Sequence, residues 1–471
     1  MRVLHVSSEV APFSKTGGLG DVVAALPQAL SALGVEACVA TPRYQHVDVS
    51  GFIEQPPLEV ELGFATEVVR IFETIQSAVR IFFVDHPPSF ARSGLYGEHG
   101  GDYPDNARRF ALFGAAASKL GALVLRPDVL HAHDWQAAPA LIYNYARRDE
   151  PDFPSTVFTI HNLAFQGRFP GATMDELGFT PELFDPRALE YYGDVNFLKG
   201  AVLLADRVTT VSPRYASEIQ TSEFGVGLDG VLRQRRQDLV GILNGIDDQV
   251  WDPARDVYLP AHFDAANLEG KEECKRALQR EFGLPEVSVP LSAAISRLSY
   301  QKGFDLITQA LPDLLTSNMQ FVVLGSGDRS LEEALTELSK RTPEKMAVRI
   351  AYDDRLAHLI EAGADLLVVP SRYEPCGLTQ LYALRYGTIP IVRATGGLDD
   401  SIIDIGESTA GTGFKFSDYS KSALTEACQR AFACYASAGW KPLVERAMAQ
   451  DFSWRRSARD YLDLYSALFH S

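Results

Sequence analysis

The chain has 471 residues, of which 46% are hydrophobic and 22% charged, and its formal net charge is −17 at pH 7. A chain of this length exceeds one ordinary hydrophobic core, so we expect two domains. The acidic balance argues against a nucleic-acid partner. No apolar run approaches the roughly 18 residues of a membrane span, so we expect no membrane partner either.

The cysteines and the first residues bear on the cellular compartment. The five cysteines form no Cys-x-x-Cys pair and leave one over, which fits a reduced chain better than a disulfide framework. The opening MRVLHVSSEV has the pattern of a strand and matches neither a signal peptide nor a transit peptide. We therefore expect a cytoplasmic protein.

The first half of the chain alternates between strand and helix patterns. The pattern predicts strands at 2–8, 35–42, 129–134, 156–162 and 208–212, and helices at 20–34, 106–120, 137–147 and 197–205. Residues 57–85 look like β-ribbons, which we interpret as an insertion and not as a strand–helix unit.

The second half repeats the alternation. Strands are predicted at 290–298, 321–327, 346–352, 365–371 and 388–394, each followed by helical or turn residues. Such alternation predicts an α/β protein whose parallel, doubly wound sheets carry helices on both faces. Turn residues at 241–253 separate the two series, and we expect the domain boundary there.

A glycine-rich loop, SKTGGLGD at 14–21, lies between the first strand and its helix. Its lysine precedes its glycines, which is the reverse of the P-loop order. Glycines at this position let backbone N–H groups approach an anion, and Lys15 adds a positive charge. The alternative is a plain turn with a solvated lysine. The segment GSGDRS at 325–330 lacks the third glycine of a dinucleotide site, so we interpret it as a turn.

Two segments of the second half form a matching arrangement. SRLSYQKG at 296–303 brings Arg297 and Lys302 to a strand-to-helix junction, and PSRYEPCGLTQLYAL at 370–384 opens a helix near Gly377. Cations beside a free helix N-terminus suit a diphosphate. Glu374 precedes that helix and could accept hydrogen bonds from sugar hydroxyls. Taken singly, Arg297 would be a surface ion pair and Glu374 a solvated cap.

These segments resemble the bacterial glycogen synthase and starch synthase family. The resemblance rests on KTGGLGDV, HAHDWQAA, TIHNLAFQG, ILNGID, SRLSYQKG and PSRYEPCGLTQLYALRYGTIPIVRATGGLDD, and it covers essentially the whole chain. It implies a GT-B fold, in which two Rossmann-like domains face each other across a deep cleft. The domains would be residues 1–245, joined by the last helix at 453–471, and residues 246–452.

The family transfers glucose from ADP-glucose to the non-reducing end of an α-1,4-glucan such as glycogen, and retains the anomeric configuration. We expect no cofactor and no required metal, because no carboxylate pair in these motifs is positioned to carry Mg²⁺. The resemblance also implies catalytic roles for Lys15, Asp134, His161, Arg297, Lys302 and Glu374. Arg297 and Lys302 would stabilise the diphosphate, and Asp134 and His161 would face the transferred glucose. The acceptor hydroxyl would attack on the face that the phosphate leaves, and would give that phosphate its proton.

Further residues match substrate-binding positions of the family. They are Gly18 and Asp21 at the donor loop, Asn162 and Asn244 near the sugar, Tyr352 near adenine, and Cys376, Gly377, Leu378 and Thr379 at the helix start above the phosphates. Two positions depart from the patterns of relatives: Gln136 stands where many have histidine, and Tyr382 stands where other retaining glycosyltransferases have a second glutamate.

Three alternatives remain open at this point. The enzyme could prefer UDP-glucose, it could be a glucan phosphorylase with lysine-bound pyridoxal phosphate, or it could be an inactive glucan-binding protein. A metal at His131 and His133 is a further possibility, but the sequence offers no third ligand in a convincing pattern. We therefore predict no metal site.

Overall fold

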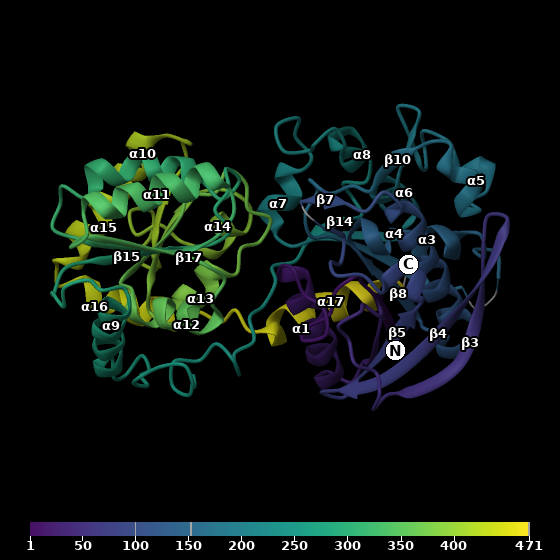
Figure 1. Cartoon of the computed structure of the whole chain (residues 1–471), viewed down its shortest axis with the longest axis horizontal. Coiled ribbons are helices and arrows are strands. Elements are labelled where there is room, and N and C mark those ends of the chain that lie inside the picture. The colour runs from purple at the N-terminus through teal and green to yellow at the C-terminus, as the bar shows by residue number, and fades with distance from the viewer. Residues whose placement is uncertain (99, 151–152, 470–471) are drawn as a thin grey trace. The chain divides into compact units, whose positions relative to one another are not determined.

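The computed structural model describes residues 1–98, 100–150 and 153–469. Within these residues the chain forms two compact units, coloured by residue number in Figure 1. The N-terminal unit contains Met1–Gly245 and the returning segment Trp454–Ser471, and the C-terminal unit contains Ile246–Ser453.

The described part of the N-terminal unit is built on a nine-stranded sheet. In spatial order the strands are β14 (Leu239–Gly241), β13 (Arg207–Thr210), β9 (Ser155–Ile160), β8 (Val129–His133), β1 (Arg2–Val6), β2 (Glu36–Pro42), β5 (Val79–Asp85), β4 (Ala65–Gln76) and β3 (Ile53–Leu62). The first seven are parallel, and β4 and β3 are antiparallel. The interpretation of residues 57–85 as an insertion was therefore partly wrong, because β5 pairs in parallel with β2.

Helices cover both faces of this sheet, with α1 and α17 on one side and α3 and α4 on the other (Figure 1). The helices are α1 (Gly18–Ala32), α2 (Pro87–Phe90), α3 (Asn106–Leu120), α4 (Asp134–Tyr145), α5 (Thr173–Leu177), α6 (Phe197–Leu204), α7 (Pro213–Glu218), α8 (Asp229–Gln234) and α17 (Trp454–Ala467). Shorter elements are η1 (Gly121–Leu125), η2 (Pro181–Leu183), β6 (Gly97–Glu98), β7 (Gly101–Asp102), β10 (Arg168–Pro170), β11 (Glu190–Tyr191) and β12 (Asp194–Asn196).

The last helix, α17, is part of the core of the N-terminal unit. Its tyrosines Tyr461 and Tyr465 are fully buried and share a hydrophobic cluster with Val3 of β1 and Leu26 of α1. Burying an aromatic ring of this size removes a large apolar surface from water. The end of the chain is therefore fastened to elements near its beginning.

The C-terminal unit has a six-stranded, all-parallel sheet within the described residues. Its order is β17 (Met346–Ile350), β16 (Gln320–Gly325), β15 (Leu291–Ile295), β18 (Leu366–Val369), β19 (Ile389–Arg393) and β20 (Phe414–Phe416). In Figure 1, α10 (Phe304–Leu314) and α11 (Arg329–Arg341) lie on one face, and α12 (Asp354–Gly363) and α13 (Thr379–Arg385) lie on the other. The remaining helices are α9 (Glu269–Glu281), α14 (Gly396–Ser401), α15 (Lys421–Tyr435) and α16 (Trp440–Met448). The predicted α/β class with parallel sheets is confirmed in both units.

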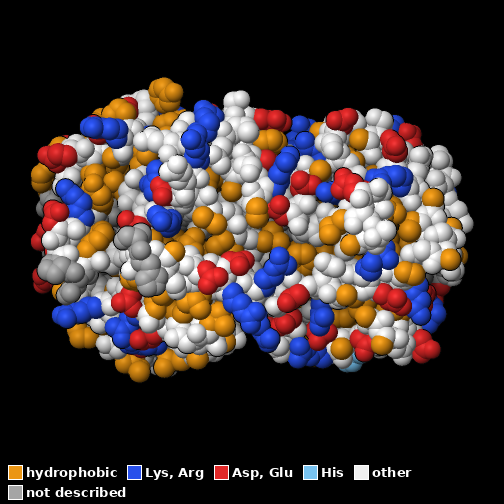
Figure 2. Space-filling model, turned by 180° about the vertical axis from the view of Figure 1, so that it is seen from behind, with side chains coloured by type: hydrophobic (Ala, Val, Ile, Leu, Met, Phe, Trp, Pro, Cys, Tyr) orange, Lys and Arg blue, Asp and Glu red, His pale blue; other side chains and the backbone are white. Residues whose placement is uncertain are grey.

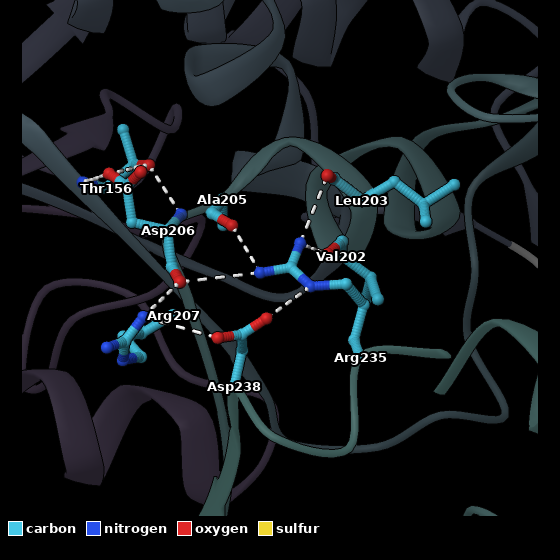
Figure 3. Close-up of polar contacts among 8 residues, drawn as sticks. All are labelled: Thr156, Val202, Leu203, Ala205, Asp206, Arg207, Arg235 and Asp238. Carbon is cyan, nitrogen blue, oxygen red and sulfur yellow. Dashed lines mark hydrogen bonds and ion pairs between the residues drawn. The ribbon is translucent and has the colours of Figure 1, made fainter. Parts of the chain in front are cut away.

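A polar network ties the amino ends of three strands in the N-terminal unit (Figure 3). Asp206, just before β13, accepts hydrogen bonds from the backbone N and the hydroxyl of Thr156 at 2.7 and 2.8 Å. Arg235 donates to the carbonyls of Val202 and Ala205, at 2.6 and 2.7 Å, and to Asp238 at 2.9 Å. These bonds hold β9, β13 and β14 at the edge opposite their carboxyl ends, where ligands bind in such sheets.

The surface carries mixed charges. On the face seen in Figure 2, acidic and basic side chains are interspersed with apolar ones. Among the residues that the structure describes, no helix has the length and apolar character needed to cross a membrane.

Candidate functional site at the carboxyl ends of the strands

The glycine-rich loop leads directly from β1 into α1. Lys15 is exposed and forms an ion pair with Asp21, with 2.8 Å between Nζ and Oδ1. Asp21 lies in the first turn of α1, which begins at Gly18. A Cβ at Gly20 would lie only 3.0 Å from the Ser14 carbonyl, so a side chain there would press on the loop. Asp21 thus orients the lysine of the loop.

Glu9 anchors this loop, and sequence reasoning missed it. Its carboxylate accepts hydrogen bonds from the backbone N and the hydroxyl of Thr16, at 2.7 and 2.6 Å, and from the Tyr96 hydroxyl at 2.6 Å. The bonds to Thr16 join positions seven residues apart, but the bond from Tyr96 spans 87 residues. A motif search over neighbouring residues could not have found that partner.

Asp134 and His161 meet where β8 and β9 end. Asp134 begins α4 with φ = 58°, a left-handed conformation that is uncommon for a residue with a Cβ. Its Oδ1 accepts a hydrogen bond from the backbone N of His161 at 2.7 Å. Burial raises the pKa of Asp134 to about 7, although the backbone amides of His161 and Asn162 counteract this rise. This aspartate therefore shapes the turn that carries His161 and Asn162.

Four histidines cluster on β1, on β8 and just after β9, and three of them, His5, His133 and His161, form a hydrogen-bonded row. His5 Nδ1 is 3.1 Å from His133 Nε2, and His133 Nδ1 is 3.0 Å from His161 Nε2. His131 instead contacts the Tyr465 hydroxyl at 2.7 Å and the Thr159 hydroxyl at 2.6 Å. Burial lowers the pKa of His5 and of His161 to about 3, and also lowers the pKa values of His131 and His133.

This row also supplies the third metal-capable side chain that the sequence did not reveal. Nitrogens of His5, His131 and His133 all lie within 4.8 Å of one another. Both nitrogens of His131 and of His133 already have hydrogen-bond partners. A metal ion would have to displace those bonds, so the cluster is better described as a hydrogen-bonded row than as an open ligand set.

The two predicted asparagines differ in their bonding. Asn162 is partly buried, and its Oδ1 accepts a hydrogen bond from the backbone N of Ala164 at 3.1 Å. Asn244 is buried, and its Oδ1 has no hydrogen-bond partner among the described residues. A buried, unpaired amide oxygen is costly unless a ligand or water completes it.

In the C-terminal unit, Lys302 and Glu374 form a two-pronged ion pair. The lysine Nζ lies 2.9 Å from Oε1 and 2.7 Å from Oε2 of the carboxylate, and Ser371 also donates to Oε2 at 3.0 Å. Glu374 is buried, whereas the Lys302 side chain keeps 22% of its surface exposed. Lys302, predicted to bind the diphosphate, and Glu374, predicted to face the sugar, therefore lie in direct contact.

Glycines bring the loops that carry this pair together. Gly303 has φ = 77°, and a Cβ there would lie 2.1 Å from the Pro370 carbonyl. The backbone N of Arg372 donates to the Gln301 carbonyl at 2.8 Å, which joins the same two loops. Gly396, with φ = 45°, lies against the Glu374 carbonyl on the other side. Only residues without a Cβ permit these approaches.

The remaining predicted residues surround the pair less closely. Arg297 is exposed and lies near Tyr373, where its charge counteracts the rise in the pKa of that tyrosine caused by burial. Tyr352, between β17 and α12, is 82% exposed. Neither side chain hydrogen-bonds another residue in the described part of the chain. At the start of α13 lie buried Cys376, Gly377 with φ = 71°, Leu378 as the capping residue and Thr379 as the first helical residue.

Both halves of the chain match family models. Residues 2–234 match the starch synthase catalytic domain, and residues 276–438 match glycosyl transferases group 1. The glycogen synthase of Anaeromyxobacter dehalogenans strain 2CP-C is 49% identical over 475 residues, covering 99% of this chain and 100% of the relative. The glycogen synthase of Koribacter versatilis is 47% identical over 479 residues, covering 99% of this chain and 98% of the relative.

Solved structures agree with this assignment. The catalytic domain of starch synthase IV from Arabidopsis thaliana, bound to ADP and acarbose, superposes with a TM-score of 0.90 at 36% identity, covering 99% of this chain and 98% of that one. Sucrose-phosphate synthase from Thermosynechococcus elongatus has a TM-score of 0.64 at 18% identity, covering 100% of this chain and 99% of that one, and shows only the shared GT-B fold. The chain belongs to the glycogen synthase family of ADP-glucose-dependent glucosyltransferases.

Proposed function

We propose that this chain transfers glucose from ADP-glucose to the non-reducing end of an α-1,4-glucan such as glycogen, with retention of the anomeric configuration. The observation that carries the proposal is the Lys302–Glu374 pair at the carboxyl end of the C-terminal sheet, with Arg297 on the same loop. The Arabidopsis relative with the same fold was solved with ADP and acarbose, a nucleotide and a sugar-like ligand. A nucleotide and a sugar-like ligand suit a site in which a cation for the diphosphate lies beside a carboxylate for the sugar.

The cations would act on the leaving group. Cleavage of the bond between glucose and diphosphate puts negative charge on a phosphate oxygen, and fixed cations stabilise that charge as it develops. An ammonium group has three donors, so Lys302 can contact both Glu374 oxygens and still direct a hydrogen towards phosphate. Glu374 would hold Lys302 in place and accept hydrogen bonds from sugar hydroxyls.

The neutral polar groups of the N-terminal unit would act on the sugar. His161 is uncharged near neutral pH because burial lowers its pKa to about 3. Asn162 lies beside it in sequence, and Asn244 offers an amide oxygen that no described residue satisfies. Neutral donors and acceptors suit hydroxyl groups, because burying them costs less than burying charge.

Retention is proposed to occur by attack on the leaving-group side. The acceptor 4-hydroxyl would attack the anomeric carbon on the face from which the phosphate departs, and its proton would pass to that phosphate. No covalent glucosyl-enzyme forms in this scheme. Trapping a glucosyl group on Glu374 or Asp134 would contradict it.

The deciding experiment follows glucose from labelled nucleotide sugars into glycogen. ADP-glucose and UDP-glucose are supplied at equal concentration, and the product is digested with an exo-acting α-1,4-glucosidase. We expect incorporation from ADP-glucose and complete release of label. Preferential use of UDP-glucose would show that UDP-glucose, and not ADP-glucose, is the donor. Absence of transfer from either would favour a glucan-binding protein, or a phosphorylase if a pyridoxal absorbance accompanies it.

A further inference from the structure

The histidine row has a direction that its hydrogen bonds define. The three rings His5, His133 and His161 are joined by two nitrogen-to-nitrogen contacts of 3.1 and 3.0 Å. The two outer nitrogens of the row are His5 Nε2 and His161 Nδ1. His5 Nε2 is buried without a hydrogen-bond partner, and His161 Nδ1 has none among the described residues. The row therefore runs from a closed, buried end to the partly exposed ring of His161.

Proton counting leaves two arrangements for three neutral rings. Each neutral imidazole carries one N–H, and each contact between rings needs one donor and one acceptor. In the first arrangement every ring is protonated on Nδ1, so His5 donates to His133 and His133 donates to His161. In the second every ring is protonated on Nε2, and all donors point the other way. A doubly protonated His133 would satisfy both contacts, but burial disfavours that charge.

The buried end of the row discriminates between these arrangements. Protonation on Nε2 would leave a buried N–H of His5 without an acceptor, whereas protonation on Nδ1 leaves only an unpaired lone pair there. Proteins rarely leave a buried N–H unpaired and more often tolerate an unpaired acceptor. The first arrangement is therefore favoured, and it ends with an N–H on His161 Nδ1.

We propose that His5 and His133 are positioning residues that hold His161 in the tautomer protonated on Nδ1, so that His161 presents a hydrogen-bond donor to the transferred sugar. The part that concerns sugar rests on the proposed function. The tautomer itself does not, because it follows from the contacts within the row.

His131, which makes a separate set of hydrogen bonds, provides a matched control for this row. His131 lies two residues before His133 on β8 and stacks on it, with 4.1 Å between ring centroids. It is equally buried, but it bonds Tyr465 and Thr159 and makes no hydrogen bond to His161. Replacing His131 therefore reports the general cost of losing a buried imidazole from this strand.

The tautomer is measured by long-range ¹H–¹⁵N correlation on the full chain labelled with ¹⁵N-histidine. Signals are assigned from the ones missing in His161→Asn and His133→Asn. We expect a protonated Nδ1 and an unprotonated Nε2 for His161 and His133 in the unliganded wild-type protein. Protonation of His161 on Nε2 would overturn the proposal, whatever the activity assays show.

Kinetics test the consequence. His133→Leu removes the donor to His161 Nε2, and His133→Asn can keep it through its amide. We expect kcat to fall about five- to tenfold in His133→Leu, the scale of one lost hydrogen bond, with little change in KM for ADP-glucose. His133→Asn and His131→Leu should stay within about twofold of wild type. Equal losses in His133→Leu and His131→Leu would reduce His133 to a structural role and overturn the positioning claim. Failure of glucose transfer by the wild type would instead refute the proposed function.

Discussion

The carboxyl ends of the two sheets handle polar groups in opposite ways. In the N-terminal unit, burial lowers the pKa values of His5, His133 and the partly exposed His161, and Asp134 accepts backbone amides with no cation in contact among the described residues. In the C-terminal unit, the buried carboxylate of Glu374 is met by a lysine on both oxygens. At Glu374 an opposite charge compensates a buried carboxylate, whereas burial of the histidines favours their neutral form. This division matches a donor whose diphosphate is charged and whose sugar is neutral.

The largest expected effect comes from breaking the charged pair. Lys302→Ala should lower kcat about 10²–10³-fold, or roughly 3–4 kcal/mol, by removing a preorganised cation from the transition state. Lys302→Arg should rescue only partly, because a planar fork does not replace a compact ammonium. Steady-state kinetics on all variants would test this. Wild-type kcat with only a raised KM would contradict the assignment.

Lys302 also contributes to the stability of the fold, because it compensates a buried carboxylate. Lys302→Ala should therefore cost up to about 3 kcal/mol, the low end for a broken buried pair because the lysine stays partly exposed. The double variant Lys302→Ala/Glu374→Gln should recover much of this stability without recovering kcat.

The buried carboxyl group of Asp134 in the N-terminal unit should make stability depend on pH. Its carboxyl binds a proton in the folded protein up to about pH 7, but releases it near pH 4 when unfolded. The folded state then binds more protons between these values, so the contribution of Asp134 to stability falls as pH rises through this window. When the pH rises from 5 to 7, the free energy of unfolding of Asp134→Asn should increase by about 2 kcal/mol relative to that of the wild type. Melting temperatures that differ by the same amount at both pH values would refute this.

Lys15 should have an intermediate effect, because it is a partly exposed cation in the N-terminal unit. It remains 40% exposed and is oriented by Asp21. We expect Lys15→Ala to lower kcat/KM for ADP-glucose about tenfold, roughly 1.4 kcal/mol, through both donor affinity and turnover. Asp21→Asn keeps the charge of Lys15 but loses the ion pair, so it should lower kcat/KM less than Lys15→Ala does. An unchanged kcat/KM in Lys15→Ala would remove the loop from the donor site.

Tyr352 should show a smaller effect that is confined to donor binding. Its ring is 82% exposed, so substitution should leave the melting temperature unchanged. Stacking of adenine on this ring would be worth about 0.5–1.5 kcal/mol, so Tyr352→Ala should raise KM for ADP-glucose about three- to tenfold. Tyr352→Phe keeps the ring and serves as the control. Equal KM values for the two variants would disprove stacking.

Metal removal should have no effect. The donor charge is expected to meet Arg297 and Lys302, and both oxygens of Glu374 contact Lys302. We therefore expect full glucose transfer in excess EDTA, measured with the same incorporation assay. Loss of activity that one divalent ion restores would show that the protein cations do not suffice.

Much of the fold was predictable from local pattern. Apolar runs at 2–8, 129–134 and 365–371 each contain a parallel strand of the structure, because a strand buried on both faces needs a continuous hydrophobic segment. The helix predicted at 106–120 has the observed bounds. The helix predicted at 137–147 begins three residues earlier, at Asp134, which directly follows β8 and has φ = 58°.

The sequence by itself determined the two α/β series, the loop residues at their strand ends and the family. Only the tertiary structure decided which of those residues touch. Glu9 meets Tyr96 across 87 residues, Lys302 meets Glu374 across 72, and His5 meets His133 across 128. Strand periodicity shows that a side chain is buried, but the order of strands in a sheet decides its neighbours. The neighbours of a buried carboxylate determine its state. At Glu374 a lysine compensates the charge, whereas at Asp134 burial raises the pKa.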